Sequence, residues 1–253
     1  MKIAVCIKQV VTREWQLRVN DARTWIRDQD ASFELNEPDA YALEEALRLK
    51  EKHTGEVVVV SAGPARAAQV IREALARGAD RAVHIESDAL ATADGVTVAD
   101  AIASAIRDEQ FDLVLTGLQS DDQGFGQVGV VLAEKLGMPH ATIIMEVQAS
   151  DGRLRVKREL EGGWFQWISL PLPSLLTIQS GINQLRYATL KGIMAAKKKE
   201  IRKVTPSSSA EPTQRIQSVY FPEKGKKTEM IPGSPAEAAK ALVKRLREDA
   251  RVI

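Results

Sequence analysis

The sequence predicts an α/β fold: a doubly wound, mostly parallel sheet with an added antiparallel hairpin region and a C-terminal extended arm that ends in a helix. Three observations support this prediction. Short β-rich runs alternate with helical runs in the first half of the chain, which is typical of a parallel sheet covered by helices. After Ala141, short strands joined by Asp-Gly and Gly-Gly turns are typical of antiparallel hairpins. From Glu200 the chain is sparse in apolar residues until a final helical stretch.

Four strand–helix pairs form the predicted parallel part. The strands fall at 2–7, 56–61, 82–85 and 112–116, and the helices that follow them at 39–53, 65–77, 95–108 and 127–136. Parallel strands that are buried on both faces contain continuous apolar runs. Val57–Val60 and Leu113–Leu115 are such runs, so both are expected to be buried strands.

The second half of the chain departs from this pattern. Antiparallel strands are predicted at 141–148, 151–160 and 163–170. Farther on, Pro206 and Ser207–Ser209 indicate an extended arm or linker. The last helix is predicted at 235–248, because Ser234 and Glu237 can form a capping box with proline at the first helical position. Such an arm has no core of its own, so we expect it to pack on the body of this chain or on a partner.

Composition excludes several classes of protein. The chain has 253 residues, of which 44% are hydrophobic and 27% charged, which is typical of a soluble globular protein with a sizeable core. With a net charge of +1, nothing favours nucleic acid. No segment approaches the about 18 apolar residues that a membrane span needs, and the N-terminus enters a strand rather than a signal peptide. We therefore expect a cytoplasmic protein without direct membrane insertion.

Catalytic and metal-binding constellations are missing from the sequence. Cys6 is the only cysteine, which excludes an internal disulfide and a cysteine-built metal site. The three histidines, His53, His84 and His140, are scattered, without the spacing of metal ligands or of a catalytic triad. No metal site and no catalytic residue are predicted.

The loop 117–129, GLQSDDQGFGQVG, is the strongest small-molecule candidate. It follows the fourth predicted strand, and ligands of open α/β sheets bind at the carboxyl ends of strands. Gly124, Gly126 and Gly129 match GxGxxG, but the dinucleotide fingerprint opens directly after its strand, and here the first of these glycines comes well after Gly117. Glycines that admit backbone N–H groups, together with the following helix N-terminus, favour a phosphate instead. The alternative is a tight loop without a ligand.

Other turns are expected at the same edge of the sheet. Cys6–Lys8 ends the first strand, Ser61–Pro64 ends the second, and Asn36 and Asp39 begin the long first helix. Each is ordinary alone, since Asn and Asp are common helix-start residues. Four turns that converge on one edge favour a nucleotide site.

The segment 184–199, QLRYATLKGIMAAKKK, joins an apolar patch to a cationic run. Leu190, Ile193 and Met194 have the spacing of one side of a helical turn, and Lys197–Lys199 would attract an acidic surface. The segment is therefore interpreted as a surface that another protein binds. The alternative is a core-facing turn followed by a solvated helix end.

Several segments resemble the beta subunit of electron transfer flavoproteins. LNEPDAYALEEALRLKEK, VVSAGPA, EALARGADRAVHI, DLVLTGLQSDDQGFGQVG and RYATLKGIMAAKKK occur in the family's order. Residues 156–177, VKRELEGGWFQWISLPLPSLLT, match the family signature in every defined position. The resemblance extends from Lys2 to about Lys199. Beyond Glu200 it is limited to length, charge and the closing helix.

This resemblance implies a non-catalytic electron carrier. In the family, an alpha subunit holds most of the redox FAD, the beta subunit buries a structural AMP, and electrons pass from acyl-CoA or other flavin dehydrogenases to a quinone-reducing acceptor. The implied AMP contacts are Cys6, Asn36, Glu37, Pro38, Asp39, Ala62, Leu118, Gln119, Ser120, Asp121, Asp122, Gln123, Gly124, Phe125, Gly126, Gln127, Val128 and Gly129. The implied partner contacts are Arg186, Tyr187, Leu190, Ile193, Met194, Lys197, Lys198 and Lys199, with Leu190 as the anchor.

The resemblance also implies a division of the chain. Residues 1–183 form the nucleotide-binding α/β domain with its hairpin extension, and 184–200 form the partner-recognition loop. Residues 201–253 form the arm and helix, which pack on the alpha subunit. We expect the chain to be stable only as a heterodimer, with Trp164, Phe165 and Trp167 as candidates for the covered surface.

Some residues depart from the family pattern. The usual proline after the asparagine is displaced to Pro38, the aromatic residue expected before Asp39 is missing, and Arg13 stands where some members place a tyrosine over the flavin. The bifurcating branch binds a second FAD in place of AMP and typically reads Asp-Gly-Asp-Thr where this chain has Ser120–Gln123. AMP is favoured and FAD is the alternative.

Two other functions are alternatives to the electron carrier. A stand-alone ATP- or AMP-handling enzyme would need a phosphate-binding lysine in a motif such as GxxxxGK[ST], which the chain lacks. A nucleotide-sensing regulatory protein without redox work is the third possibility.

Overall fold

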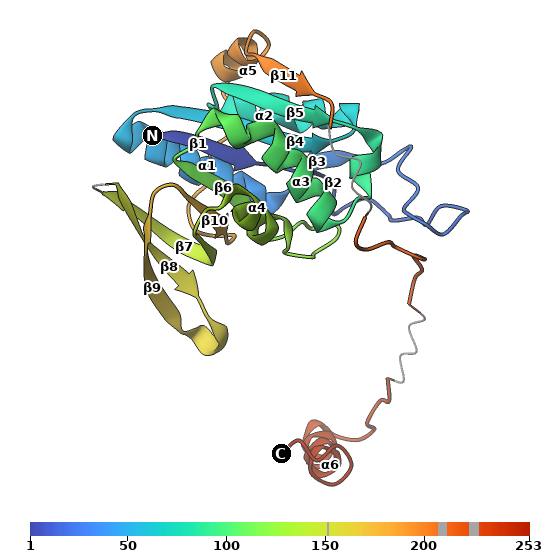
Figure 1. The fold of residues 1–253 in the computed structure, drawn as a ribbon. Coiled ribbons are helices and arrows are strands. Elements are labelled where there is room, and N and C mark those ends of the chain that lie inside the picture. Colours follow the sequence, from blue (N-terminus) through green and yellow to red (C-terminus); the bar gives the residue numbers. More distant parts are fainter. Residues whose placement is uncertain (151, 207–211, 223–227) are drawn as a thin grey trace. The chain divides into compact units, whose positions relative to one another are not determined.

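The computed structural model describes residues 1–150, 152–206, 212–222 and 228–253. Asp151 of the predicted Asp-Gly turn and Ser207–Ser209 of the predicted linker lie outside the described residues. The chain divides into a large unit, residues 1–219, and a small C-terminal unit, residues 220–253. Figure 1 traces the chain through both units.

The large unit is built on a sheet of nine strands in the order β11-β5-β4-β1-β6-β10-β7-β8-β9. The bounds are β1 Lys2–Cys6, β4 Glu56–Gly63, β5 Arg81–Glu86, β6 Leu113–Gly117, β7 His140–Ser150, β8 Arg153–Glu159, β9 Phe165–Pro171, β10 Ser174–Ile178 and β11 Ile201–Val204. Pairing is parallel from β11 to β7 and antiparallel for β7–β8 and β8–β9. A second, two-stranded antiparallel sheet pairs β2 Gln9–Val11 with β3 Phe33–Leu35.

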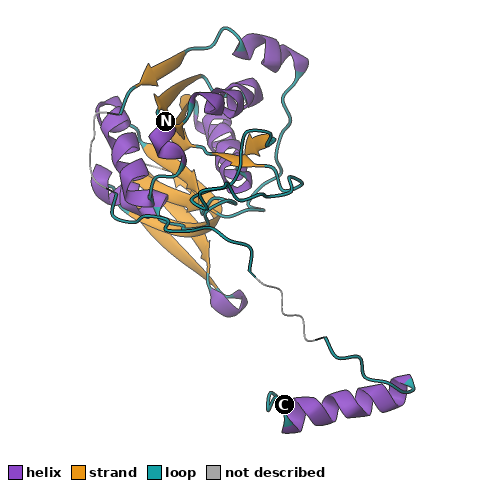
Figure 2. Cartoon of the chain, turned by 90° about the vertical axis from the view of Figure 1, so that its right-hand side faces the viewer, coloured by secondary structure: helices purple, strands orange, loops and turns teal. Residues whose placement is uncertain are grey.

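Helices cover both faces of the parallel part (Figure 2). In the large unit the bounds are α1 Glu37–His53, α2 Ala68–Arg77, α3 Gly95–Ile106, α4 Val128–Leu136 and α5 Leu190–Ala196. The C-terminal unit contains α6 Pro235–Glu248. Alternate residues of a strand point to opposite faces, so Ile3 and Val5 of β1 pack with α1 and α2, whereas Ala4 packs with α3 and α4. The predicted doubly wound fold is therefore confirmed. In Figure 1, β7, β8 and β9 extend beyond the helices as the antiparallel region.

Most predicted elements agree with the structure to within three residues at either end, and α6 has the predicted bounds. The Ser234–Glu237 capping box is present, with the Ser234 side chain and the Glu237 carboxylate each bonding the other residue's backbone N–H. Four strands were not expected from the sequence: β2, β3, β10 and β11. β10 inserts between β6 and β7, and β11 pairs with β5, so the predicted arm begins with an edge strand of the main sheet.

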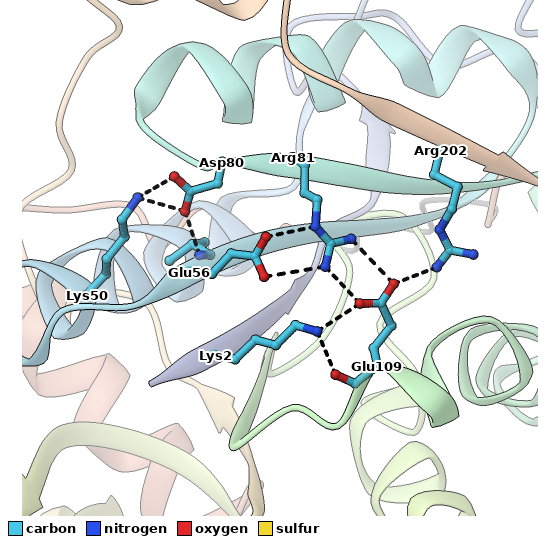
Figure 3. A network of polar contacts seen from close by, with 8 residues as sticks. Lys2, Lys50, Glu56, Asp80, Arg81, Glu109 and Arg202 are labelled. Atoms are coloured by element: carbon cyan, nitrogen blue, oxygen red, sulfur yellow. Dashed lines mark hydrogen bonds and ion pairs between the residues drawn. The ribbon is translucent and has the colours of Figure 1, made fainter.

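A network of ion pairs lies at the amino-terminal edge of this sheet (Figure 3). The Glu109 carboxylate accepts from Lys2 Nζ at 2.9 Å, Arg81 Nη2 at 2.7 Å and Arg202 Nη2 at 2.9 Å. Arg81 also pairs with Glu56 at 2.8 Å. Hydrogen bonding from Arg81 lowers the pKa of Glu109 to about 2. One carboxylate thus joins β1, β5 and β11 at the edge opposite the strands' carboxyl ends.

Candidate functional site

The strand order creates a crevice at the carboxyl edge of the sheet. From β1 the chain builds β4 and β5 on one side and β6 on the other, and the carboxyl ends of β1 and β6 diverge at such a reversal of strand order. A cavity lies at this position, lined by the ends of β1, β4 and β6 and by the beginnings of α1, α3 and α4. Its place is the one in which open α/β sheets bind nucleotides.

Thirteen of the eighteen predicted cofactor residues line this cavity. They are Cys6, Asn36, Asp39, Ala62, Leu118, Gln119, Ser120, Gln123, Phe125, Gly126, Gln127, Val128 and Gly129. The structure does not bring Glu37, Pro38, Asp121, Asp122 and Gly124 into the lining. Three of these five have carboxylates in ion pairs near the loop, Glu37 and Asp121 with Arg13 and Asp122 with Lys8.

Asp39 holds the two diverging strands together. Its buried carboxylate accepts the Lys8 N–H at 2.8 Å and the Gly117 N–H at 3.0 Å, one from the chain after β1 and one from the end of β6. Burial raises the pKa of Asp39 to about 7. A Cβ atom at Gly117 would come within 2.3 Å of Asp39 Oδ1, so glycine at this position is required by the close approach of the carboxylate.

The loop after β6 is held by Asn36 and Lys8. Asn36 Nδ2 donates to the Gln119 carbonyl at 3.0 Å, and Asn36 Oδ1 accepts the Asp121 N–H at 2.9 Å. Lys8 Nζ donates to Asp122 Oδ1 at 2.7 Å and to Gln123 Oε1 at 2.9 Å. Lys8 was not among the predicted cofactor residues, although the first strand's end was expected at this edge.

The glycines of the loop have different physical roles. Gly126 has a φ of +62°, a left-handed conformation that favours glycine. Gly129 has no such requirement, but a Cβ there would lie 2.6 Å from both Thr116 Oγ1 and Thr177 Cγ2. Gly129 therefore allows α4 to pack closely against the sheet. The sequence analysis had interpreted this glycine as one that admits a phosphate.

The cavity presents hydrogen-bond donors beside apolar walls. α4 has no side-chain cap at its N-terminus, so its first amide groups remain available to a ligand. Gln123 Nε2 is buried without a hydrogen-bond partner among the described residues. Leu90, Val98 and Ile102 supply apolar surface that sequence reasoning missed, because apolar residues around α3 look the same whether they line a cavity or fill the core.

A second cavity adjoins the first and shares Lys8, Ala62, Leu90, Gln123 and Phe125 with it. Its distinctive lining includes the aromatic residues Trp15, Trp25 and Phe33. It also contains arginines and carboxylates in ion pairs, Arg13 with Asp121 and Arg66 with Asp28. Aromatic side chains and arginines both stack on flat ligands. The two cavities together offer room for a ligand longer than a mononucleotide.

The segment that the sequence identified as a protein-docking surface presents its apolar side chains to solvent. Thr189 caps α5 by accepting the Gly192 N–H at 3.0 Å. The exposed fractions are 89% for Tyr187, 84% for Leu190 and 63% for Met194, and Ile193 is also exposed. The core-facing alternative therefore does not describe Leu190.

Two of the predicted partner cations are engaged within the chain. Lys199 Nζ donates to the Leu75 carbonyl at 3.1 Å, and burial lowers the pKa of its ammonium group. Arg186 pairs with Glu44 and Glu51 of α1. The expected cluster of three solvated lysines is thus reduced to the exposed Lys197 and Lys198, because the third lysine turns toward the end of α2.

The antiparallel extension carries a second exposed apolar surface. Trp164, Phe165 and Trp167 are exposed. Cations from β8 cover two of the rings, with Arg155 4.3 Å from the Trp167 centroid and Lys157 4.2 Å from that of Phe165. Exposed aromatic groups of this size are typical of protein interfaces.

The described residues contain neither a helix that could span a membrane nor a candidate metal centre. None of their helices is both long and apolar enough to span a bilayer. Among the same residues, no group of three or more His, Cys, Asp or Glu side chains is arranged to hold a metal ion.

The fold defines a doubly wound α/β protein with a cavity at the switch in strand order, and comparisons with known proteins give its family. A model of the electron transfer flavoprotein domain matches residues 24–209. The chain is 36% identical to an electron transfer flavoprotein subunit beta of Methylophilus methylotrophus over 261 residues, with 98% of each chain covered. It is 35% identical to the Bacillus subtilis subunit over all of both chains, and 35% identical to the human subunit over 100% of this chain and 99% of that one. The chain belongs to the electron transfer flavoprotein beta subunit family, which implies a role in electron transfer rather than classical enzyme catalysis.

Proposed function

We propose that the chain is the beta subunit of a heterodimeric electron transfer flavoprotein, with a structural AMP in the crevice between β1 and β6. The redox FAD is held mainly by the alpha subunit, and it supplies the electron-transfer chemistry. Electrons pass from acyl-CoA or other flavin dehydrogenases to a quinone-reducing acceptor. The observation that carries the proposal is the cavity at the switch in strand order, with free donors on one side and apolar walls on the other.

The cavity suits a nucleoside monophosphate. The first amide groups of α4 can donate to a phosphate, and the helix dipole favours its negative charge. Leu90, Val98 and Ile102 offer an apolar wall to an adenine ring. The unpartnered Gln123 Nε2 would gain an acceptor from the ligand. Leaving a buried donor unsatisfied costs about 1–3 kcal/mol, so its pairing favours binding.

A second FAD in this subunit is the alternative, as in the bifurcating branch. The observation in its favour is the adjoining cavity, whose tryptophans and arginines suit a flavin or a second nucleotide. The loop sequence Ser120–Gln123 differs from the pattern typical of that branch, so AMP remains the first choice.

Two surfaces are proposed to bind protein partners. α5 inserts Leu190 into an apolar pocket of the dehydrogenase, with Tyr187 and Met194 beside it, and the exposed Lys197 and Lys198 steer the encounter. The aromatic surface of β9 and the C-terminal arm with α6 pack on the alpha subunit. Exposed apolar side chains on α6, Leu242 and Val243, support the second assignment because they need a cover.

Co-expression with an alpha subunit tests the proposed function. Gel filtration, the flavin spectrum and chromatography of the heat-released nucleotides should give a heterodimer with one FAD and one AMP. Two FAD without AMP would replace the proposal by its alternative. A chain that unfolds cooperatively as a monomer and is unaffected by the alpha subunit would contradict the heterodimer.

A further inference from the structure

The docking segment, residues 186–199, is attached to α1 at its beginning. Arg186 Nε lies 2.8 Å from Glu44 Oε2, and Arg186 Nη1 lies 2.6 Å from Glu51 Oε1. The Glu44 side chain is only 4% exposed, and it also accepts the Arg186 main-chain N–H at 3.2 Å. One buried carboxylate therefore fixes both the main chain and the side chain of Arg186.

The same segment is attached to α2 at its end. Arg72 Nη1 donates to the carbonyl of Ala196 at 2.6 Å and to that of Lys199 at 2.8 Å. Carbonyls in the last turn of a helix lack partners within the helix. The Ala196 carbonyl at the end of α5 also accepts the Lys199 N–H at 3.2 Å, and Arg72 adds a charged donor to it and to the Lys199 carbonyl in the turn that follows. In return, Lys199 Nζ donates to carbonyls at the end of α2. Each helix end is capped by a cation from the other segment.

Between these two attachments, α5 lies directly on α2. A Cβ atom at Gly192 would come within 2.3 Å of the Ala76 carbonyl oxygen, and Ala196 is 3% exposed. Leu190 and Met194 are exposed on the same short helix. A helix of seven residues is too short to be stable alone in water. Its conformation therefore depends on the contacts with α1 and α2.

We propose that Arg72 and the Glu44–Arg186 pair are positioning residues for dehydrogenase docking. They hold α5 in its helical form before the partner arrives, so that Leu190 and Met194 are presented together. This inference rests on the docking role proposed above. Binding by a segment that is already ordered avoids the entropic cost of ordering it in the complex, so the attachment lowers the dissociation constant without touching the partner.

The test uses the heterodimer with Arg72→Ala and, separately, Glu44→Gln. The control is Arg107→Ala, because Arg107 Nη2 also donates to a carbonyl near a helix end, that of Lys135 in α4, at 3.0 Å. Amide hydrogen exchange is measured over residues 186–199, and KM and kcat are measured with an acyl-CoA dehydrogenase as the varied component.

In both variants we expect about tenfold faster exchange in α5 and a KM for the dehydrogenase raised about fivefold or more, since hydrogen bonds to charged groups are among the stronger ones. The value of kcat should not change, because transfer within the filled complex is unaffected. Arg72→Lys keeps a cationic donor, so its KM for the dehydrogenase should lie between that of Arg72→Ala and that of the wild type. Arg107→Ala should leave exchange in α5 and KM at the wild-type values.

Either of two results would overturn the inference: unchanged exchange in α5, or faster exchange with an unchanged KM. Glu44→Gln keeps the test decisive if Arg72→Ala does not fold. Leu190→Ala is measured in parallel to separate this inference from the docking role. A raised KM for Leu190→Ala with a normal KM for Arg72→Ala would reject only the positioning role, whereas normal values for both would reject docking through α5 as well.

Discussion

Replacing Leu190 by alanine should weaken docking while leaving the fold intact. The Leu190 side chain is 84% exposed, so folding buries only the remaining 16% of its surface. Full burial of a leucine contributes about 1.5–3 kcal/mol, and this fraction therefore corresponds to less than about 0.5 kcal/mol of folding stability. A central anchor in a partner's pocket instead contributes about 2 kcal/mol, which corresponds to about a 30-fold change in the dissociation constant.

The assay compares the melting temperature with the rate of electron transfer from a dehydrogenase in the same variant. Leu113 of β6 is fully buried, and Leu113→Ala serves as the matched core control, with an expected loss of about 2–5 kcal/mol of folding stability. For Leu190→Ala we expect a melting temperature within about 2 °C of the wild type, an unchanged flavin spectrum and a strongly raised KM. A large fall in melting temperature with normal transfer kinetics would show that the assignment of Leu190 is wrong.

Three further predictions concern other parts of the chain. Gly126→Val should remove AMP but not the FAD of the alpha subunit, whereas Gly137→Val, at an equally left-handed φ of +66° away from the cavity, should retain AMP; released-nucleotide chromatography decides. Replacing Lys197 and Lys198 with glutamine should slow association at low ionic strength and have little effect at high salt, where stopped-flow rates should converge because salt screens exposed charges. Glu109→Gln should lower the free energy of unfolding by about 1–2 kcal/mol at pH 7, an amount reduced for solvent screening. Because the pKa of Glu109 is lowered from 4.5 to about 2, this difference should shrink as the pH falls from about 4.5 to about 2; a pH-independent difference in urea melts would refute the role of its charge.

The sequence predicts the fold well where the signal is local. Alternating strand and helix patterns, and a capping box such as that of Ser234 and Glu237, depend on residues close together in the chain. The positions of β10 (SLLTI) and β11 (IRKV) could not be predicted in the same way, because strands this short, with only two or three apolar residues, do not specify their pairing partners. β10 lies between β6 and β7, a place that only the assembled sheet defines.

In the candidate site, too, some residues could be predicted from local sequence and others depend on the assembled fold. Asn36, Asp39 and the 117–129 loop could be placed together from the rule that parallel strands share a carboxyl edge. Val98 could not, since a valine facing a cavity has the same sequence pattern as one in the core. Lys199 has the same identity as its two neighbours in sequence, and only the position of α2 separates the lysine that caps a helix from those that face water.

The pairing of β11 with β5 limits how the chain can be shortened. Removing everything after Lys199 would delete Ile201–Val204 as well as the arm, and the unpaired backbone of β5 would then become an open sheet edge. Open edges promote association between copies of a chain, whereas the short β11 carries Arg202 and Lys203, charges that discourage such pairing. A truncated protein meant to lack only the arm should therefore end after Val204, and aggregation of a shorter form would report a lost edge strand rather than a lost partner contact.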